Sequence, residues 1–165
     1  MIGNDVIDLK LAREESNWKR KGFLDKLFTK NEQKLIFLAE NPEIMVWNLW
    51  SRKEAVYKIY HRQTKLSAFI PKQLECTEVD VLLNKKHGKV TINCCDYFTE
   101  TVVNSDFIHS IAVTKMEDFE KITIVSVKDI SKDYYGIPYH SSTKNPVSIS
   151  HHGRFERKIQ LDIYS

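Results

Sequence analysis

The sequence predicts an α+β protein in which an antiparallel sheet packs against helices. Helix signals dominate the first 62 residues, whereas β-branched residues in runs or alternation follow after that point, as is typical of strands. Clusters of Gly, Pro, Asn and Ser separate these runs. With 165 residues, 42% hydrophobic and 28% charged residues, the chain has enough material for one globular domain with its own core.

The first forty residues predict a short strand and two helices. Residues 6–9 are expected to end a strand, and a charged helix is expected from about residue 11 to residue 20, where Gly22 interrupts it. Thr29, with Glu32 three residues later, forms a capping box ahead of the apolar residues of a further helix.

A longer helix is expected from about residue 42 to residue 60. Asn41-Pro42 ends the preceding helix and starts this one, because Pro is tolerated in the first turn of a helix and excluded from its interior. Its inward-facing side chains are expected to be Trp47, Trp50, Ala55 and Ile59.

The remaining chain is expected to form strands joined by turns. His87-Gly88 reads as a hairpin turn, and residues 116–120 and 131–144 read as polar connections. Residues 66–134 form a long segment without a recognisable motif, which we expect to extend the sheet. The predicted strands are residues 77–83, 90–94, 108–113, 122–127 and 158–164.

Composition excludes several classes of protein. A net charge of +3 is too small to indicate a nucleic-acid partner, and the basic clusters at residues 19–21 and 85–87 are most simply solvated faces. No run of roughly 20 apolar residues could span a bilayer, and the polar residues near the N-terminus do not fit a signal peptide. We therefore expect a cytoplasmic protein without a membrane partner. The three cysteines, Cys76, Cys94 and Cys95, lack the spacing of a zinc site and are expected to be reduced and semi-buried.

Several polar residues have more than one interpretation when each is taken alone. Glu54 and Lys58 stand four apart on one helical face, and such a pair is often a surface pair that contributes about 0.2–0.5 kcal/mol. Asp5 or Asp8 could simply cap the turn between strand and helix. His151, in a His-His-Gly sequence, could belong to a turn or a weak metal site.

Four motifs, taken together and in order, resemble the 4'-phosphopantetheinyl transferase superfamily. They are Gly-Asn-Asp-x-x-Asp at residues 3–8, Phe-Thr-x-x-Glu at 28–32, Trp-Ser-x-Lys-Glu-Ala-x-x-Lys at 50–58 and Ser-x-Ser-His at 148–151. Their order is similar to that of the small holo-acyl-carrier-protein synthases. The Trp-Ser pair and the strand at 108–113 look more like the larger, two-halved transferases.

The resemblance implies an Mg²⁺-dependent transfer of the phosphopantetheine arm of coenzyme A, the co-substrate, onto a serine of an acyl or peptidyl carrier protein. Such an enzyme serves fatty acid or polyketide biosynthesis and releases 3',5'-adenosine bisphosphate. Asp5 and Glu54 match the metal-binding carboxylates of the family, and Asp8 falls where a further acid often stands. Mg²⁺ suits this chemistry because it prefers hard oxygen ligands and keeps several waters.

The resemblance also assigns catalytic and coenzyme A-binding residues. Lys58 matches the lysine that faces the pyrophosphate, and Glu54 is the candidate base for the carrier serine, acting directly or through a metal-bound water. Coenzyme A binding is assigned to Ser150 and His151, together with Lys53 and Lys58.

One departure from the family pattern concerns the coenzyme A phosphates. Ile137 stands where many members have the lysine of a Gly-Lys-Pro sequence, so a phosphate contact is missing or supplied elsewhere, and Lys144 or Arg154 are plausible substitutes. Ile137 also favours an alternative function, a catalytically silent module that binds coenzyme A or a carrier protein. A small nucleic-acid binder is disfavoured because the chain lacks an interleaved aromatic and basic motif.

Chain length bears on quaternary structure. In the family the site lies between two similar halves, and this chain has material for about one half plus an extension. We therefore expect a homo-oligomer, a dimer or trimer, with the site at the subunit interface. The competing arrangement is a monomer in which residues 135–165 fold back as a reduced second half.

Overall fold

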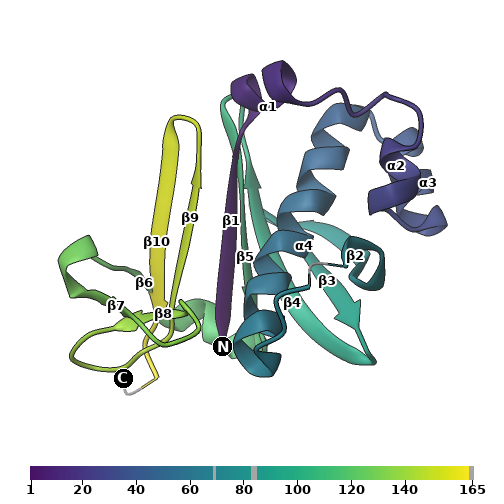
Figure 1. Ribbon diagram of the computed structural model, residues 1–165. Helices are drawn as coiled ribbons and strands as arrows, with labels where there is room; N and C mark the ends of the chain where they lie inside the picture. The colour runs from purple at the N-terminus through teal and green to yellow at the C-terminus, as the bar shows by residue number, and fades with distance from the viewer. Residues whose placement is uncertain (69, 83–84, 164–165) are drawn as a thin grey trace.

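The computed structural model describes residues 1–68, 70–82 and 85–163 and has the predicted α+β architecture (Figure 1). Its described residues form a five-stranded antiparallel sheet in the order β1-β5-β4-β3-β2, a three-stranded sheet in the order β6-β10-β9, and the pair β7-β8. In chain order the elements are β1 (Ile2–Asp8), α1 (Leu9–Glu15), α2 (Phe23–Leu27), α3 (Lys30–Leu38), α4 (Pro42–Thr64), η1 (Pro71–Gln73), β2 (Glu75–Leu82), β3 (Lys85–Ile92), β4 (Cys95–Val103), β5 (Phe107–Val113), η2 (Met116–Lys121), β6 (Ile122–Ile124), η3 (Val127–Asp129), β7 (Ile130–Lys132), β8 (Pro138–His140), β9 (Val147–His152) and β10 (Phe155–Leu161).

The main core lies between α4 and the five-stranded sheet, as Figure 1 shows. Trp47, Ala55 and Ile59 of α4 are buried as predicted, whereas Trp50 is only partly buried and packs at the edge of the core. Asn41 caps α4, because its side chain accepts a hydrogen bond from the Ile44 amide, and the helix runs four residues beyond the predicted end. α4 is thus a long helix that packs across the sheet, and it carries the motif at residues 50–58.

The other helix boundaries follow from their caps. The capping box of Thr29 and Glu32 is present in both directions, as predicted. The first helix begins at Leu9 rather than residue 11, because the Asp8 carboxylate accepts hydrogen bonds from the first-turn amides, and it ends at Glu15 rather than residue 20. Gly22, at φ +82°, therefore does not end the first helix as predicted; it is the N-cap of α2.

Four strands, β4, β7, β8 and β9, were not predicted, and one turn was placed wrongly. β4 and β9 were missed because Thr and acidic residues in β4, and Ser and His in β9, interrupt the apolar pattern. His87-Gly88 lies inside β3, paired with both neighbouring strands, and is not a turn. The turn after β3 falls instead at Asn93 and Cys94, both in the left-handed region.

Other strand boundaries also differ from the prediction. β6 stops at Ile124 because a 3₁₀ helix follows, and β10 runs over Phe155–Leu161, three residues earlier than expected. The expected strand end at residue 164 lies outside the described residues. The two polar connections contain η2, β7 and β8, and residues 66–134 supply β2 to β5, most of the large sheet.

Two further expectations from the sequence concern the cysteines and the helices. All three cysteines are free; Cys76 is buried, whereas Cys94 and Cys95 are exposed at the turn, where we expected semi-buried side chains. In the described part of the chain, no helix combines the length and apolar character needed to cross a membrane.

Gly3 sets the distance between β1 and α4. A Cβ atom built on Gly3 would lie 1.9 Å from the carbonyl oxygen of Ala55, a backbone atom that cannot turn away. β1 therefore approaches α4 more closely than any other residue at this position would allow.

We predict that Gly3→Ala will destabilise the protein. Relief of the contact requires β1 to move away from α4, and such overpacking typically costs about 1–3 kcal/mol. Urea unfolding followed by circular dichroism would measure the loss. An unchanged midpoint would show that the two elements can separate freely, contrary to the geometry at Ala55.

Candidate active site

The site is built along β1, whose two edges are bonded in different ways. One edge pairs with β5 through a regular antiparallel ladder. On the other edge the amides of Asn4, Val6 and Asp8 donate to side chains of β9: to Ser148 Oγ at 2.9 Å, to Ser150 Oγ at 2.8 Å and to His152 Nδ1 at 2.9 Å. Both strands advance by two residues at each bond, so they run in the same direction. We call this side-chain contact between β1 and β9 the seam; the two strands lie side by side in Figure 1.

Asp5 and Glu54 bring two carboxylates together between β1 and α4. Both side chains line one cavity of about 260 Å³. Burial, and then the negative charge of Asp5, raise the pKa of Glu54 to about 7. Burial likewise raises the pKa of Asp5, although Lys58 and the hydroxyls of Ser150 and Ser51 oppose that shift. The two acids therefore share a region where negative charge is poorly solvated, and a cation would stabilise both.

The donor set fits a magnesium ion better than a fully protein-ligated metal. Within residues 1–68, 70–82 and 85–163, no group of three or more His, Cys, Asp and Glu side chains is placed to hold a metal. Mg²⁺ is commonly held by one or two carboxylates, with waters and substrate oxygens completing the coordination. Asp5, whose side chain is 15% exposed, and Glu54 satisfy that requirement.

Lys58 lies at the centre of the seam. Its Nζ donates to the carbonyl oxygens of Asn4 on β1, at 2.6 Å, and Ile149 on β9, at 3.1 Å, and it lies 3.8 Å from Asp5 Oδ1. Burial lowers the pKa of Lys58, while Asp5 and Glu54 raise it. The ammonium is therefore held in a fixed position, one helical turn after Glu54 and beside the carboxylate pair.

Asp8, the third carboxylate assigned to the metal, is occupied by other contacts. Its Oδ1 accepts bonds from the Lys10 and Leu11 amides, and Arg154 donates to both of its oxygens at 2.8 and 2.9 Å. These hydrogen bonds from Arg154 hold the pKa of Asp8 well below its usual range. Asp8 caps α1 and anchors the turn after β9, where Gly153 approaches it closely, and we leave it out of the proposed metal site.

Lys53, assigned by sequence to coenzyme A, is enclosed in the core instead. Its side chain has no exposed surface, and Nζ donates to Glu32 Oε2 at 2.7 Å, Leu27 O at 2.9 Å and Pro71 O at 2.8 Å. All three protons of the ammonium are used. The assignment to coenzyme A does not fit such a side chain. Lys53 instead forms a structural ion pair with Glu32 of the Thr29-Glu32 motif.

The two residues of the Ser-His motif lie in different places, one in the seam and the other in the cavity. Ser150 is 5% exposed and is bonded within the seam, whereas His151 is exposed and lines the 260 Å³ cavity with Asp5 and Glu54. Apolar side chains of α2 and α4 form part of that cavity, namely Phe23, Leu27, Trp47 and Trp50.

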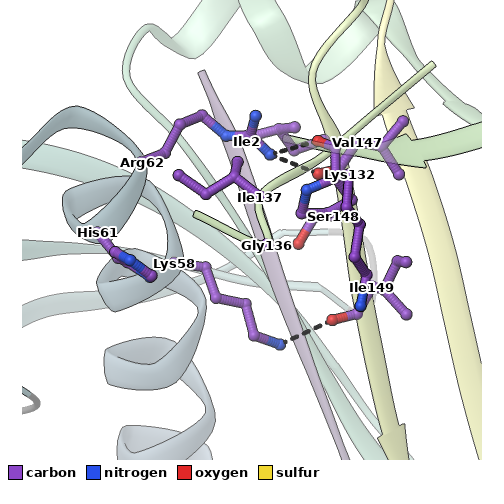
Figure 2. Close-up of a pocket in the computed structure, with 11 residues that line it drawn as sticks. Ile2, Lys58, His61, Arg62, Lys132, Gly136, Ile137, Val147, Ser148 and Ile149 are labelled. Carbon is purple, nitrogen blue, oxygen red and sulfur yellow. Dashed lines mark hydrogen bonds between the residues drawn. The ribbon is translucent and has the colours of Figure 1, made fainter. Parts of the chain in front are cut away.

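Lys58 lines a second cavity, of about 320 Å³ (Figure 2). Its charged side chains are cationic, and none of its lining residues is acidic. Arg62 is held there by the carbonyl oxygens of Pro138 and Val147, at 2.9 and 2.6 Å. The basic residues that line it are Lys58, His61, Arg62 and Lys132.

Ile137 also lines this second cavity, and it is buried. Neither suggested substitute for a lysine at its position is present there: Lys144 lies over the Tyr139 ring and donates to Ser141, and Arg154 binds Asp8. Arg62 and Lys132 supply the positive charge instead. Sequence reasoning missed Arg62, although it lies one further turn along the helical face of Glu54 and Lys58.

The Ser-His motif meets Asp5 within a single chain. Residues 138–161 fold back so that β9 and β10 lie beside β1, with Asn4 donating to the Arg157 carbonyl oxygen as well. We expected the motif and the carboxylates to meet across a subunit interface, and that arrangement is not required: the geometry is that of the competing, folded-back arrangement.

This chain is similar in sequence to known proteins. A family model for the 4'-phosphopantetheinyl transferase superfamily matches residues 1–112. Three curated relatives are each named holo-[acyl-carrier-protein] synthase. The protein of Chlamydia muridarum is 30% identical over 91 residues, 55% of this chain and 68% of the relative. That of Protochlamydia amoebophila is 28% identical over 113 residues, 67% and 85% of the two chains, and that of Chlamydia caviae is 27% identical over 126 residues, 76% and 93%.

We predict that Lys53→Met will destabilise the fold by about 3–5 kcal/mol, because it leaves the Glu32 carboxylate buried without its partner. Adding Glu32→Gln to the same variant should restore part of the loss, since no buried charge then remains. Urea unfolding would measure both values. A Lys53→Met protein of unchanged stability with a raised KM for coenzyme A would restore the original assignment.

Proposed function

The chain belongs to the 4'-phosphopantetheinyl transferase superfamily, and on that basis we propose that it transfers the 4'-phosphopantetheine arm of coenzyme A to a serine of a carrier protein. The observation that carries the proposal is the convergence of Asp5, Glu54 and Lys58 between β1 and α4. The names of the relatives support an acyl carrier protein as the acceptor, and a peptidyl carrier remains within the proposal.

Asp5 and Glu54 are proposed to hold Mg²⁺. When bound, the ion supplies positive charge to the pyrophosphate oxygens of coenzyme A. Their burial and mutual proximity favour a cation at this place, which is the argument for a metal-dependent enzyme rather than a general base acting alone.

Glu54 is proposed as the base. Its carboxylate accepts the proton of the carrier serine, while the serine oxygen forms a bond to the β-phosphorus of coenzyme A. The bond from that phosphorus to the bridging oxygen breaks, and 3',5'-adenosine bisphosphate leaves. Without a metal the pKa of Glu54 is about 7, and a bound cation would lower it, so the carboxylate is ionised and able to accept the proton at neutral pH.

Lys58 is proposed to stabilise the leaving phosphate. Its ammonium is fixed by two carbonyl oxygens, lines the second cavity and lies 3.8 Å from Asp5 Oδ1, so little reorganisation is needed when charge develops. The cationic cavity with Arg62 and Lys132 is proposed to receive the nucleotide phosphates, and His151 to contact coenzyme A from the other side.

The alternative of a catalytically silent module rests on Ile137 alone, and the cations around that residue weaken it. The homo-oligomer expected from the sequence likewise stays a prediction. It no longer follows from the Ser-His motif, because that motif reaches Asp5 within one chain. Light scattering after size exclusion would measure the mass in solution.

The test of the proposed function is direct transfer. The protein should add the phosphopantetheine arm to at least one unmodified carrier, among fatty-acid, polyketide and peptide types, when coenzyme A and Mg²⁺ are supplied. Intact-mass spectrometry detects the product. Coenzyme A binding without modification of any carrier would support the silent module.

Three substitutions should separate the proposed roles. Asp5→Asn and Glu54→Gln are expected to abolish transfer with the fold retained, whereas Lys58→Ala should keep coenzyme A bound and lower kcat about 10²–10³-fold. Glu43→Gln, in the first turn of the same helix and paired with Arg13, is the matched control and should keep full activity. An active Glu54→Gln variant would refute the metal and base assignments.

We predict that kcat/KM rises with pH through about 7 at low Mg²⁺, because only the ionised Glu54 accepts a proton or binds a cation. Saturating Mg²⁺ should move this rise to lower pH, since a bound cation stabilises the carboxylate. Initial rates measured from pH 5 to pH 9 at two Mg²⁺ concentrations would show both effects. A pH profile that does not change with the Mg²⁺ concentration would show that Glu54 does not bind the metal.

A further inference from the structure

We propose that Ser150 is a positioning residue, whose hydroxyl holds the Asp5 carboxylate in the orientation that binds the metal, and that Ser150 does not bind coenzyme A. This inference rests on the proposed function, and it replaces the coenzyme A-binding role that the sequence motif suggested for Ser150.

The hydrogen bonds of Ser150 determine where its proton lies. Its Oγ accepts the Val6 amide at 2.8 Å and lies 3.1 Å from Asp5 Oδ1. The amide is an obligatory donor and occupies a lone pair of the hydroxyl, so the hydroxyl proton is free to point at the carboxylate. With Ser150 5% exposed, neither side of this hydroxyl is left for a phosphate.

The bond matters because Asp5 has a competing partner. Lys58 Nζ lies 3.8 Å from the same Oδ1, in a poorly solvated place where a direct ion pair would be strong. Ser150 holds Oδ1 from the β9 side at 3.1 Å, which opposes a closer approach of that oxygen to Lys58 and, in this proposal, presents the other oxygen to a cation. Ser51, which donates to the Asp5 carbonyl oxygen at 3.2 Å, fixes the backbone of the same residue from α4.

Ser148 provides an internal control within the seam. It accepts the Asn4 amide at 2.9 Å and donates to Asn4 Oδ1 at 2.7 Å, and it is 3% exposed. The two serines therefore make the same pair of hydrogen bonds, two residues apart. Ser148 donates to the neutral side chain of Asn4, the residue whose amide it accepts, whereas Ser150 donates to the carboxylate of Asp5, the residue before the one whose amide it accepts. Any effect of seam packing is common to both, and any effect on the metal belongs to Ser150.

The experiment compares Ser150→Ala with Ser148→Ala by Mn²⁺ binding, followed by electron paramagnetic resonance without a carrier protein, first alone and then with coenzyme A. Residues that orient metal ligands typically contribute about 10–100-fold to affinity. We expect Ser150→Ala to weaken Mn²⁺ binding by at least about tenfold and Ser148→Ala to leave it within about twofold. Both variants should lose similar thermal stability, because each leaves one β1 amide without an acceptor.

Steady-state kinetics give a second readout. Ser150→Ala should raise the half-saturating Mg²⁺ concentration for transfer with the KM for coenzyme A unchanged, and Ser150→Thr, which keeps the hydroxyl, should restore metal affinity. Equal Mn²⁺ affinity in the two alanine variants, absent Mn²⁺ binding in the parent protein, or a raised KM for coenzyme A with unchanged metal affinity would each overturn the inference. Failure of the parent protein to modify any carrier would refute the proposed function, while the Mn²⁺ comparison would still report on Ser150.

Discussion

The structure depends on how the free edge of β1 is satisfied. A strand edge leaves a row of amide and carbonyl groups that must find partners, and β1 obtains them from β9 without forming a ladder. Side chains act as the acceptors, so the carbonyl oxygens that a ladder would have used stay available. Two of these, on Asn4 and Ile149, bind the Lys58 ammonium. One constraint therefore joins the two sheets, places the cation and directs a hydroxyl at Asp5.

Two lysines of α4 show how one motif serves both folding and chemistry. Lys53 forms a buried ion pair, and its contacts join α2, α3, α4 and η1. Lys58 instead lines the second cavity. At about 100° per residue, Lys58 lies about 40° from Glu54 around the helix but about 140° from Lys53. The helical geometry already separates Lys53 from the functional face, although motif matching treats both lysines alike.

Local signals predicted what is local in this molecule. The capping box at Thr29, the start of α4 and the spacing of Glu54 and Lys58 depend on residues near one another in sequence, whereas the pairing of Asp5 with Glu54 was expected only from the family resemblance. The bonds from Ser150 and Arg154 to β1 join residues about 140 positions apart, and no periodicity reports them. β4 and β9 escaped prediction for a related reason. Their polar side chains, such as Thr99 and Ser150, are buried only because other elements supply hydrogen bonds.

The seam also determines strand register in an unusual way. In a backbone ladder every residue offers the same amide and carbonyl, so register depends on the surrounding side chains and turns. Along β9 the acceptors are the alternate residues Ser148, Ser150 and His152 themselves. A slip by one residue would present Ile149, which has no side-chain acceptor, and a slip by two would leave one β1 amide facing the turn beyond His152. The Ser-x-Ser-x-His sequence therefore specifies the register between the two sheets in addition to supplying the hydrogen bonds that join them.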